Sequence, residues 1–197
     1  AEIVGPYRRA KRRLLLFDYD GTLAPIRSRP EEAVPSHRLC ELLRTLGTDA
    51  ANRVVICSGR DSGTLEKWFG GLPVSLAAEH GAFYKDRGAW RCNIRPASWD
   101  PKLSALLEHF ARKTPRSRIE RKQTALAWHY READSWLGQL RAQQLVNALM
   151  PLCARLNLHI LQGDKVVEIK SPRFTKGSET LRLLRQERYD FILALGD

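Results

Sequence analysis

Short apolar runs separated by amphipathic segments constrain the fold of this chain more than any other feature. Residues 13–17, 53–57 and 74–78 are mostly apolar, and segments with helical spacing separate them. Strands buried on both faces have this composition, and a strand–helix–strand alternation implies a parallel sheet with right-handed crossovers. The same rhythm returns later, with an expected helix at 176–188 and an apolar strand at 191–195. The sequence therefore predicts an α/β fold built on a parallel sheet.

The middle of the chain has a different rhythm, in which short strands follow one another and two longer helices intervene. Strands are expected at 83–85, 90–94, 117–121, 125–130, 158–161 and 166–169, and helices at 100–113 and 134–156. Hairpins crossed by helices are typical of an α+β lobe. We therefore expect one α/β core, formed by residues 1–82 and 171–197, that is split by an inserted α+β domain at residues 83–170.

Charge and cysteine content narrow the functional classes. The 197 residues include 33 Lys and Arg against 22 Asp and Glu, but the basic residues are spread out and only residues 8–13 form a run. Without a zinc finger, an aromatic RNA-binding signature or a heptad repeat, this pattern favours a solvated basic surface, or an attraction for phosphorylated substrates, over nucleic-acid binding. The four cysteines form no C-x-x-C pair, and no apolar run approaches the roughly 20 residues that span a bilayer. We therefore expect a cytoplasmic protein that binds neither nucleic acid nor membrane.

Two carboxylates, Asp18 and Asp20, follow the first apolar run in the sequence DYDGT at 18–22. Open α/β sheets bind ligands at this edge, although Asp and Gly after a strand are also ordinary turn residues. An ionised Asp18 can attack phosphorus as a nucleophile, while Asp20 can protonate the leaving oxygen and then activate water. Mg²⁺ prefers oxygen ligands and would hold phosphate oxygens against these anions.

Three further segments bring polar groups to the ends of neighbouring strands. Ser58, Gly59 and Arg60 follow the second strand and offer a hydroxyl and backbone amides to a phosphoryl oxygen, so we expect them to contact the substrate. Lys176 opens a helix, where its charge could offset that of the attacked phosphoryl group, and Asp197 closes the last apolar run. Each segment alone is commonplace. Their order after successive apolar runs predicts a single site for phosphoryl transfer.

The series DYDGT, SGR, Lys176 and GD resembles motifs one to four of the haloacid dehalogenase superfamily, whose phosphatases work through an aspartyl-phosphate and Mg²⁺. A finer resemblance, to the trehalose-6-phosphate phosphatase family, covers nearly the whole chain. It lies in LLLFDYDGTLAPI (14–26), ICSGRD (56–61), LAAEHGAF (76–83), IERKQTALAWHYR (119–131) and VVEIKSPRFTKG (166–177). The resemblance implies a haloacid dehalogenase-like Rossmannoid core with an inserted α+β cap, and hydrolysis of trehalose 6-phosphate to trehalose and phosphate.

The resemblance also implies a metal site. It would set the first and last strands side by side, so that Asp18 and Asp197 share one Mg²⁺ with the backbone carbonyl of Asp20 as another ligand. Glu79 and His80, in the segment LAAEHGAF, match the family too and are expected to contact the substrate.

Sugar contacts are expected in the inserted domain, where Glu120, Lys122, Arg131 and Glu168 match family positions. Residues 120 and 122 alternate along a strand and therefore point to the same face, which would place an acid and a base together in the cleft. A cross-strand salt bridge on an exposed sheet is the alternative. His129 has aromatic neighbours on both sides, and we expect it to pack rather than to react.

Two rival functions stay open. The chain could be a phosphatase for another sugar phosphate, such as sucrose 6-phosphate, or a non-catalytic phosphatase-like domain that regulates or scaffolds a synthase. Residues 3–13 resemble the linker that joins a synthase domain to the phosphatase in two-domain trehalose enzymes, and the family continues past the fourth motif. We therefore expect this chain to be part of a longer protein, with a fused or associated trehalose-6-phosphate synthase domain as its partner.

Overall fold

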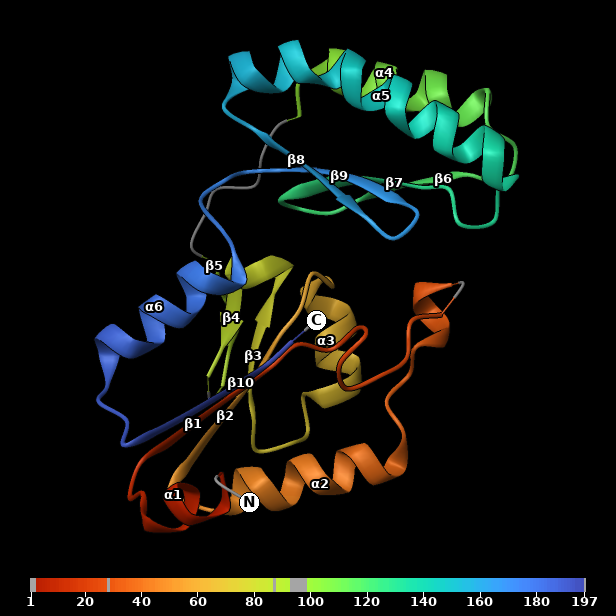
Figure 1. The fold of residues 1–197 in the computed structure, drawn as a ribbon. Coiled ribbons are helices and arrows are strands. Elements are labelled where there is room, and N and C mark those ends of the chain that lie inside the picture. Colours follow the sequence, from red (N-terminus) through yellow and green to blue (C-terminus); the bar gives the residue numbers. More distant parts are fainter. Residues whose placement is uncertain (1–2, 28, 87, 93–98, 197) are drawn as a thin grey trace. The chain divides into compact units, whose positions relative to one another are not determined.

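A six-stranded sheet in the order β10-β1-β2-β3-β4-β5 forms the centre of the first of two units, which comprises residues 1–94 and 174–197 (Figure 1). The structure is a computed structural model that describes residues 3–27, 29–86, 88–92 and 99–196. The expected α/β core with a parallel sheet is confirmed. Its parallel strands are β10 (Phe191–Leu195), β1 (Arg13–Phe17), β2 (Asn52–Cys57) and β3 (Ser75–Ala78), and its antiparallel strands are β4 (Phe83–Lys85) and β5 (Arg91–Cys92).

Alternate residues of the central strands are buried on opposite faces of this sheet, which explains why the runs are wholly apolar. Leu15 and Phe17 belong to one buried cluster, whereas Leu14 and Leu16 belong to another. The first unit contains helices α1 (Val4–Arg9), α2 (His37–Thr48), α3 (Ser62–Phe69) and α6 (Lys176–Gln186), and the 3₁₀ turns η1 (Pro30–Glu32) and η2 (Glu79–Gly81). The side chains of Ser36, Asp61 and Thr175 accept hydrogen bonds at the starts of α2, α3 and α6 and so fix where these helices begin.

The second unit, residues 95–173, is a four-stranded antiparallel sheet with two helices on one face (Figure 1). Its elements are α4 (Pro101–Arg112), β6 (Arg118–Arg121), β7 (Ala125–His129), α5 (Ser135–Leu156), β8 (His159–Gly163) and β9 (Val166–Lys170). Leu126 and Trp128 of β7 are buried with Leu107 of α4 and Leu145 of α5 in one apolar cluster. The other residues of β7, which alternate with these, include the small Ala125 and Ala127 and point to the opposite face.

The second unit is shorter than the predicted insertion at residues 83–170. Strand β4 pairs with β3 and β5 pairs with β4, so both strands belong to the six-stranded sheet. The change of rhythm after residue 82 marks a switch from parallel to antiparallel pairing rather than a change of domain. The predicted strand at 90–94 extends onto residues 93 and 94, which lie outside the described residues.

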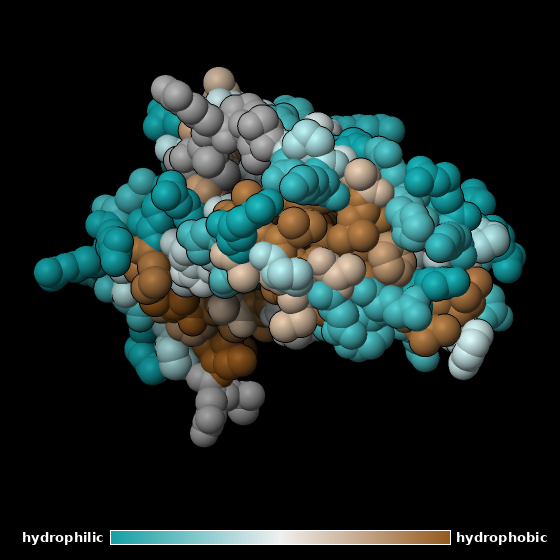
Figure 2. All heavy atoms as spheres, turned by 90° about the horizontal axis from the view of Figure 1, so that it is seen from above, coloured by the Kyte–Doolittle hydropathy of each residue, from teal (hydrophilic) through white to brown (hydrophobic). Residues whose placement is uncertain are grey.

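Much of the surface drawn in Figure 2 is hydrophilic, with apolar side chains gathered in patches between the polar ones. None of the described helices combines the length and the apolar composition needed to cross a lipid bilayer.

Candidate active site

Asp18 lies at the point where the ends of β1, β10 and α6 meet. Its backbone N–H donates to the carbonyl of Leu195 (2.9 Å), and its side chain is only 7% exposed. One carboxylate oxygen accepts a hydrogen bond from the backbone N–H of Tyr19 (2.7 Å), and the other accepts one from the ammonium group of Lys176, the first residue of α6. The fold thus places the predicted nucleophile beside the predicted lysine, although the two residues are 158 positions apart in the chain.

Asp20 faces a different cation, Arg60. The Nε of Arg60 donates to one carboxylate oxygen of Asp20 (2.9 Å) and its Nη2 to the other (2.6 Å), which is a two-point ion pair. Directly after Asp20 the chain turns at Gly21, which has a φ of 82° and donates its N–H to the carbonyl of Ala24 (2.8 Å). Both predicted carboxylates therefore stand at the carboxyl end of β1, and each has a cationic partner.

Ser58 and Gly59 directly follow β2 at the same edge of the sheet. Ser58 is buried; its hydroxyl oxygen accepts a hydrogen bond from the N–H of Arg60 (3.1 Å), and its carbonyl accepts one from the N–H of His80 (2.9 Å). A Cβ on Gly59 would lie 2.9 Å from the imidazole of His80, so a side chain at residue 59 would displace that ring. The SGR segment and His80 consequently form one closely packed group.

The turn Glu79–Gly81 is strained. Glu79 and His80 have φ angles of 47° and 60°, which non-glycine residues rarely adopt, and Gly81 has a φ of 99°. A Cβ on Gly81 would lie 2.8 Å from the Cβ of Glu179 in α6, so the turn and the helix are in close contact. Such backbone strain tends to gather at functional sites, where the surrounding structure enforces it.

Helix α6 contains an internal ion pair that the sequence analysis missed. Glu179 is buried and accepts two hydrogen bonds from Arg182, at 2.7 and 2.5 Å. This pair lies within α6 and stabilises its first turns, whereas the close approach of Gly81 to the Cβ of Glu179 packs the same part of the helix against the turn. An acid followed three residues later by a base on a predicted helix was the available signal.

Oxygen donors dominate the part of this edge where a metal is expected. The carboxylate of Asp18 and the backbone carbonyl of Asp20 are hard donors of the kind that Mg²⁺ prefers, so the chemistry of these groups fits that ion. Asp197, the third predicted ligand, lies outside the described residues. Within the described part of the chain, no three His, Cys, Asp or Glu side chains are grouped so that they could hold a metal ion.

Glu120, Lys122 and Glu168 gather on the face of the four-stranded sheet opposite its helices. Ala127 of β7 pairs with Glu120 of β6 on one side and with Glu168 of β9 on the other, and its small side chain leaves space between the two acids. The Nζ of Lys122 lies 3.3 Å from Glu168 Oε2 and 3.9 Å from Glu120 Oε2. The predicted acid and base therefore share a face. The alternative, a cross-strand salt bridge, is also present, because Lys122 pairs with both acids.

His129 joins this cluster through its ring nitrogen Nε2, which lies 2.8 Å from Glu120 Oε2. Burial by itself raises the pKa of Glu120, but the hydrogen bond with His129 and the charge of Lys122 outweigh burial, and the pKa lies below its ordinary value. A packing role was expected for His129, whereas the structure gives it a polar contact. Arg131, which is also predicted to bind sugar, donates to the carbonyl of Asp164 (2.6 Å) and pairs with its carboxylate (2.8 Å).

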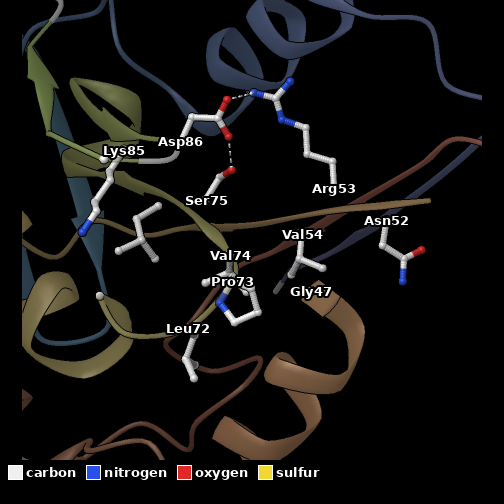
Figure 3. Close-up of a pocket in the computed structure, with 13 residues that line it drawn as sticks. Gly47, Asn52, Arg53, Val54, Leu72, Pro73, Val74, Ser75, Lys85 and Asp86 are labelled. Carbon is white, nitrogen blue, oxygen red and sulfur yellow. Dashed lines mark hydrogen bonds and ion pairs between the residues drawn. The ribbon is translucent and has the colours of Figure 1, made fainter. Parts of the chain in front are cut away.

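A cavity of about 240 Å³ lies at the opposite end of the parallel strands, where β2 and β3 begin (Figure 3). The cavity lining includes Asp86, which accepts hydrogen bonds from two other lining residues, Arg53 (3.0 Å) and Ser75 (2.7 Å). None of the described site residues lines this cavity. Strand topology therefore separates it from the candidate active site.

Comparison with known proteins links this arrangement to one family. A family profile described as Trehalose-phosphatase matches residues 16–197. The curated Trehalose-phosphatase of Zygosaccharomyces rouxii is 42% identical over 97% of this chain and 24% of its own length, and the bifunctional trehalose-6-phosphate synthase/phosphatase of Thermoproteus tenax is 41% identical over 97% and 26%. The C-terminal domain of Candida albicans trehalose-6-phosphate phosphatase, at 38% identity, superposes with a TM-score of 0.93 over 100% of this chain and 73% of that domain. The chain thus spans about a quarter of the length of the curated relatives it matches.

Proposed function

The chain belongs to the trehalose-phosphatase family, and on that basis we propose that it hydrolyses trehalose 6-phosphate to trehalose and phosphate. The observation that carries the proposal is the pairing of the buried carboxylate of Asp18 with Lys176 at the carboxyl end of β1. An ordinary turn or a surface ion pair does not require a buried carboxylate that contacts a lysine. A nucleophile that must stay ionised beside an incoming phosphate does require this arrangement.

In the first step, a carboxylate oxygen of Asp18 bonds to phosphorus while the bond between phosphorus and the sugar oxygen breaks. Asp20, in its protonated form, gives its proton to that sugar oxygen, so trehalose leaves as a neutral alcohol. Lys176 offsets negative charge on the phosphoryl group, and Ser58 offers its hydroxyl to a phosphoryl oxygen. The product left on the protein is an aspartyl-phosphate.

In the second step, the now ionised Asp20 takes a proton from a water molecule whose oxygen attacks phosphorus. The bond between phosphorus and the oxygen of Asp18 breaks, and phosphate departs. Asp18 is restored as a carboxylate and Asp20 as an acid, so the atoms and charges of the cycle balance.

Mg²⁺ is the cofactor that suits these donors. The Asp18 carboxylate, the Asp20 carbonyl and Asp197 would hold it, and when bound it would offset the repulsion between the nucleophile and the phosphate. Gly59, Glu79 and His80 belong to the closely packed group beside Ser58, and we assign them to the phosphate side of the site.

Sugar recognition is assigned to the polar face of the second unit. Glu120, Lys122 and Glu168 supply charged acceptors and donors, and a disaccharide presents hydroxyls that both donate and accept hydrogen bonds. A site built on such groups penalises a sugar that lacks the matching hydroxyl. We assign Arg131 to the same face. Because the relative from Thermoproteus tenax is described as bifunctional, we also infer a fused or associated synthase domain as the partner of this chain.

Phosphate release from trehalose 6-phosphate and from sucrose 6-phosphate tests the proposal. We expect faster turnover of trehalose 6-phosphate, and we expect chelation of divalent ions by EDTA to stop it until Mg²⁺ is restored. Faster turnover of sucrose 6-phosphate would assign the chain to another sugar phosphate. A folded protein that releases phosphate from neither substrate would favour a non-catalytic, regulatory role.

A further inference from the structure

Arg60 was expected to bind the substrate, but its guanidinium group is already engaged on several sides. Besides the two contacts with Asp20, its Nη1 donates to the carbonyl of Pro30 (2.7 Å). The guanidinium carbon lies 4.6 Å from the ring centre of Trp68 and 5.5 Å from that of Tyr19. Only 11% of the Arg60 side chain is exposed, whereas 40% of the Asp20 side chain is exposed.

The geometry of the pair fixes the orientation of the carboxyl group. A planar guanidinium that contacts both oxygens at once prevents the carboxylate from rotating, which a point charge such as an ammonium group does not do. The aromatic rings hold the guanidinium plane in turn. The hydroxyl of Tyr19 donates to the carbonyl of Ala33 (2.5 Å). Arg60 and Tyr19 therefore anchor the same loop, at Pro30 and Ala33.

From this geometry we propose that Arg60 is a positioning residue for Asp20, which it aims at the leaving oxygen, and that it does not bind the phosphoryl group. The inference rests on the proposed function, in which Asp20 is the general acid. The two-point pair describes the ionised form of Asp20. When Asp20 carries its proton, one oxygen still accepts from Arg60, which Pro30 and Trp68 keep in place, and the other oxygen presents the proton to the leaving oxygen.

The effect of an Arg60 substitution on esters with different leaving groups distinguishes the positioning role from phosphate binding. A phenolate is a much stronger base than a 2,4-dinitrophenolate, so phenyl phosphate needs the proton from Asp20 and 2,4-dinitrophenyl phosphate hardly needs it. Both esters are aryl phosphates, and neither carries sugar hydroxyls. A positioning defect therefore slows only the first ester, whereas a lost phosphate ligand slows both.

The experiment measures kcat/KM for both esters, because this ratio reports the steps through cleavage of the ester bond. We expect Asp20→Asn and Arg60→Lys to lower kcat/KM for phenyl phosphate, Arg60→Lys by about 10- to 100-fold, within the contribution of a general acid. For 2,4-dinitrophenyl phosphate we expect Arg60→Lys to change kcat/KM by less than about threefold. In the double variant, Arg60→Lys should add little to Asp20→Asn, because it acts through Asp20.

Arg53→Lys is the matched control. Arg53 is similarly shielded, with 15% of its side chain exposed, and it pairs with Asp86 at the opposite end of β2. We expect this change to leave the ratio of the two kcat/KM values unaltered. Thermal unfolding midpoints identify any variant that fails to fold. If Arg60→Lys is such a variant, Trp68→Leu removes the ring beneath the guanidinium and should show the same selectivity more weakly.

Equal losses for both esters with a raised KM would overturn the inference and make Arg60 a phosphate ligand. Unchanged kinetics for phenyl phosphate would overturn it as well, and so would an undiminished effect of Arg60→Lys in the Asp20→Asn background. Failure of the proposed function has a different signature. In that case Asp20→Asn itself would show no dependence on the leaving group.

Discussion

The carboxyl edge of the six-stranded sheet and the polar face of the four-stranded sheet both gather charged side chains, but by different means. At the sheet edge, Lys176 reaches Asp18 across 158 positions of sequence and Arg60 reaches Asp20 across 40. On the polar face, Glu120 meets His129 only nine positions away, through one hairpin. The first arrangement depends on the whole topology, whereas the second depends on the register of neighbouring strands. Under the proposed division of roles, we therefore expect changes on the polar face to alter recognition while the chemistry of the edge persists.

The largest effect that would sharpen this comparison comes from Asp18→Asn, which removes the charge of the nucleophile and nearly preserves its shape. We expect phosphate release to fall by roughly 10³-fold or more, both for trehalose 6-phosphate and for a small aryl phosphate. Asp190→Asn is the matched control, because Asp190 lies at the amino end of β10 and caps the backbone N–H groups of residues 11 and 12. Retention of most activity by Asp18→Asn would eliminate the covalent mechanism.

A change on the polar face should separate the two substrates. We expect Glu120→Ala to lower kcat/KM for trehalose 6-phosphate on the order of 10- to 100-fold, as when a hydrogen bond to a charged group is lost. Hydrolysis of an aryl phosphate without sugar hydroxyls should stay within about twofold of the unchanged protein. Glu108→Ala in α4 is the control, since Glu108 belongs to the same unit and pairs with Arg121 at its surface. Equal losses on both substrates would contradict the division of roles between the two regions.

Local periodicity was enough to predict most of the elements. Strands at 13–17 and 191–195 have the predicted bounds, and the helices that follow Ser36 and Asp61 begin where those residues accept hydrogen bonds. Pairing was harder to predict, because β4 looks the same in sequence whether it joins the core sheet or the inserted domain. The choice depends on β3, a contact that local patterning does not encode.

The residues of the site were easier to predict than their partners. Motif order placed Asp18, Asp20 and Lys176 at one edge, but the side on which the guanidinium of Arg60 lies depends on Tyr19 and the other side chains packed around it. The positive φ angles of Glu79 and His80 leave no mark in a sequence, unlike a glycine at such a position.

The contact between His129 and Glu120 was hidden for a similar reason. Strand register places Arg118 opposite His129 and Ala127 opposite Glu120, so the two side chains meet diagonally. Alternation along one strand reveals which face a residue occupies. It does not reveal which residue lies diagonally across from it on the neighbouring strand.

The smallest effect tests that diagonal contact. We expect His129→Phe to raise the KM for trehalose 6-phosphate about three- to tenfold with little change in kcat, because Glu120 loses a hydrogen bond that orients it. His129→Gln can still donate from a similar position and should restore most of the affinity. His109→Phe, in α4 of the same unit, is the control.

The pH dependence of stability should change in the same variant. Because the pKa of Glu120 is lowered in the folded chain, its charge contributes stability above the pKa of the unfolded state, and this contribution is lost as the pH falls through the folded value. His129→Phe removes one cause of the lowering, so the contribution should be smaller and its loss should be complete at a higher pH. Thermal unfolding midpoints measured in acidic buffers would test this. Coinciding curves for His129→Phe and the unchanged protein would mean that His129 does not stabilise the ionised form of Glu120. The charge of Lys122 would then be the main cause of the lowered pKa of Glu120.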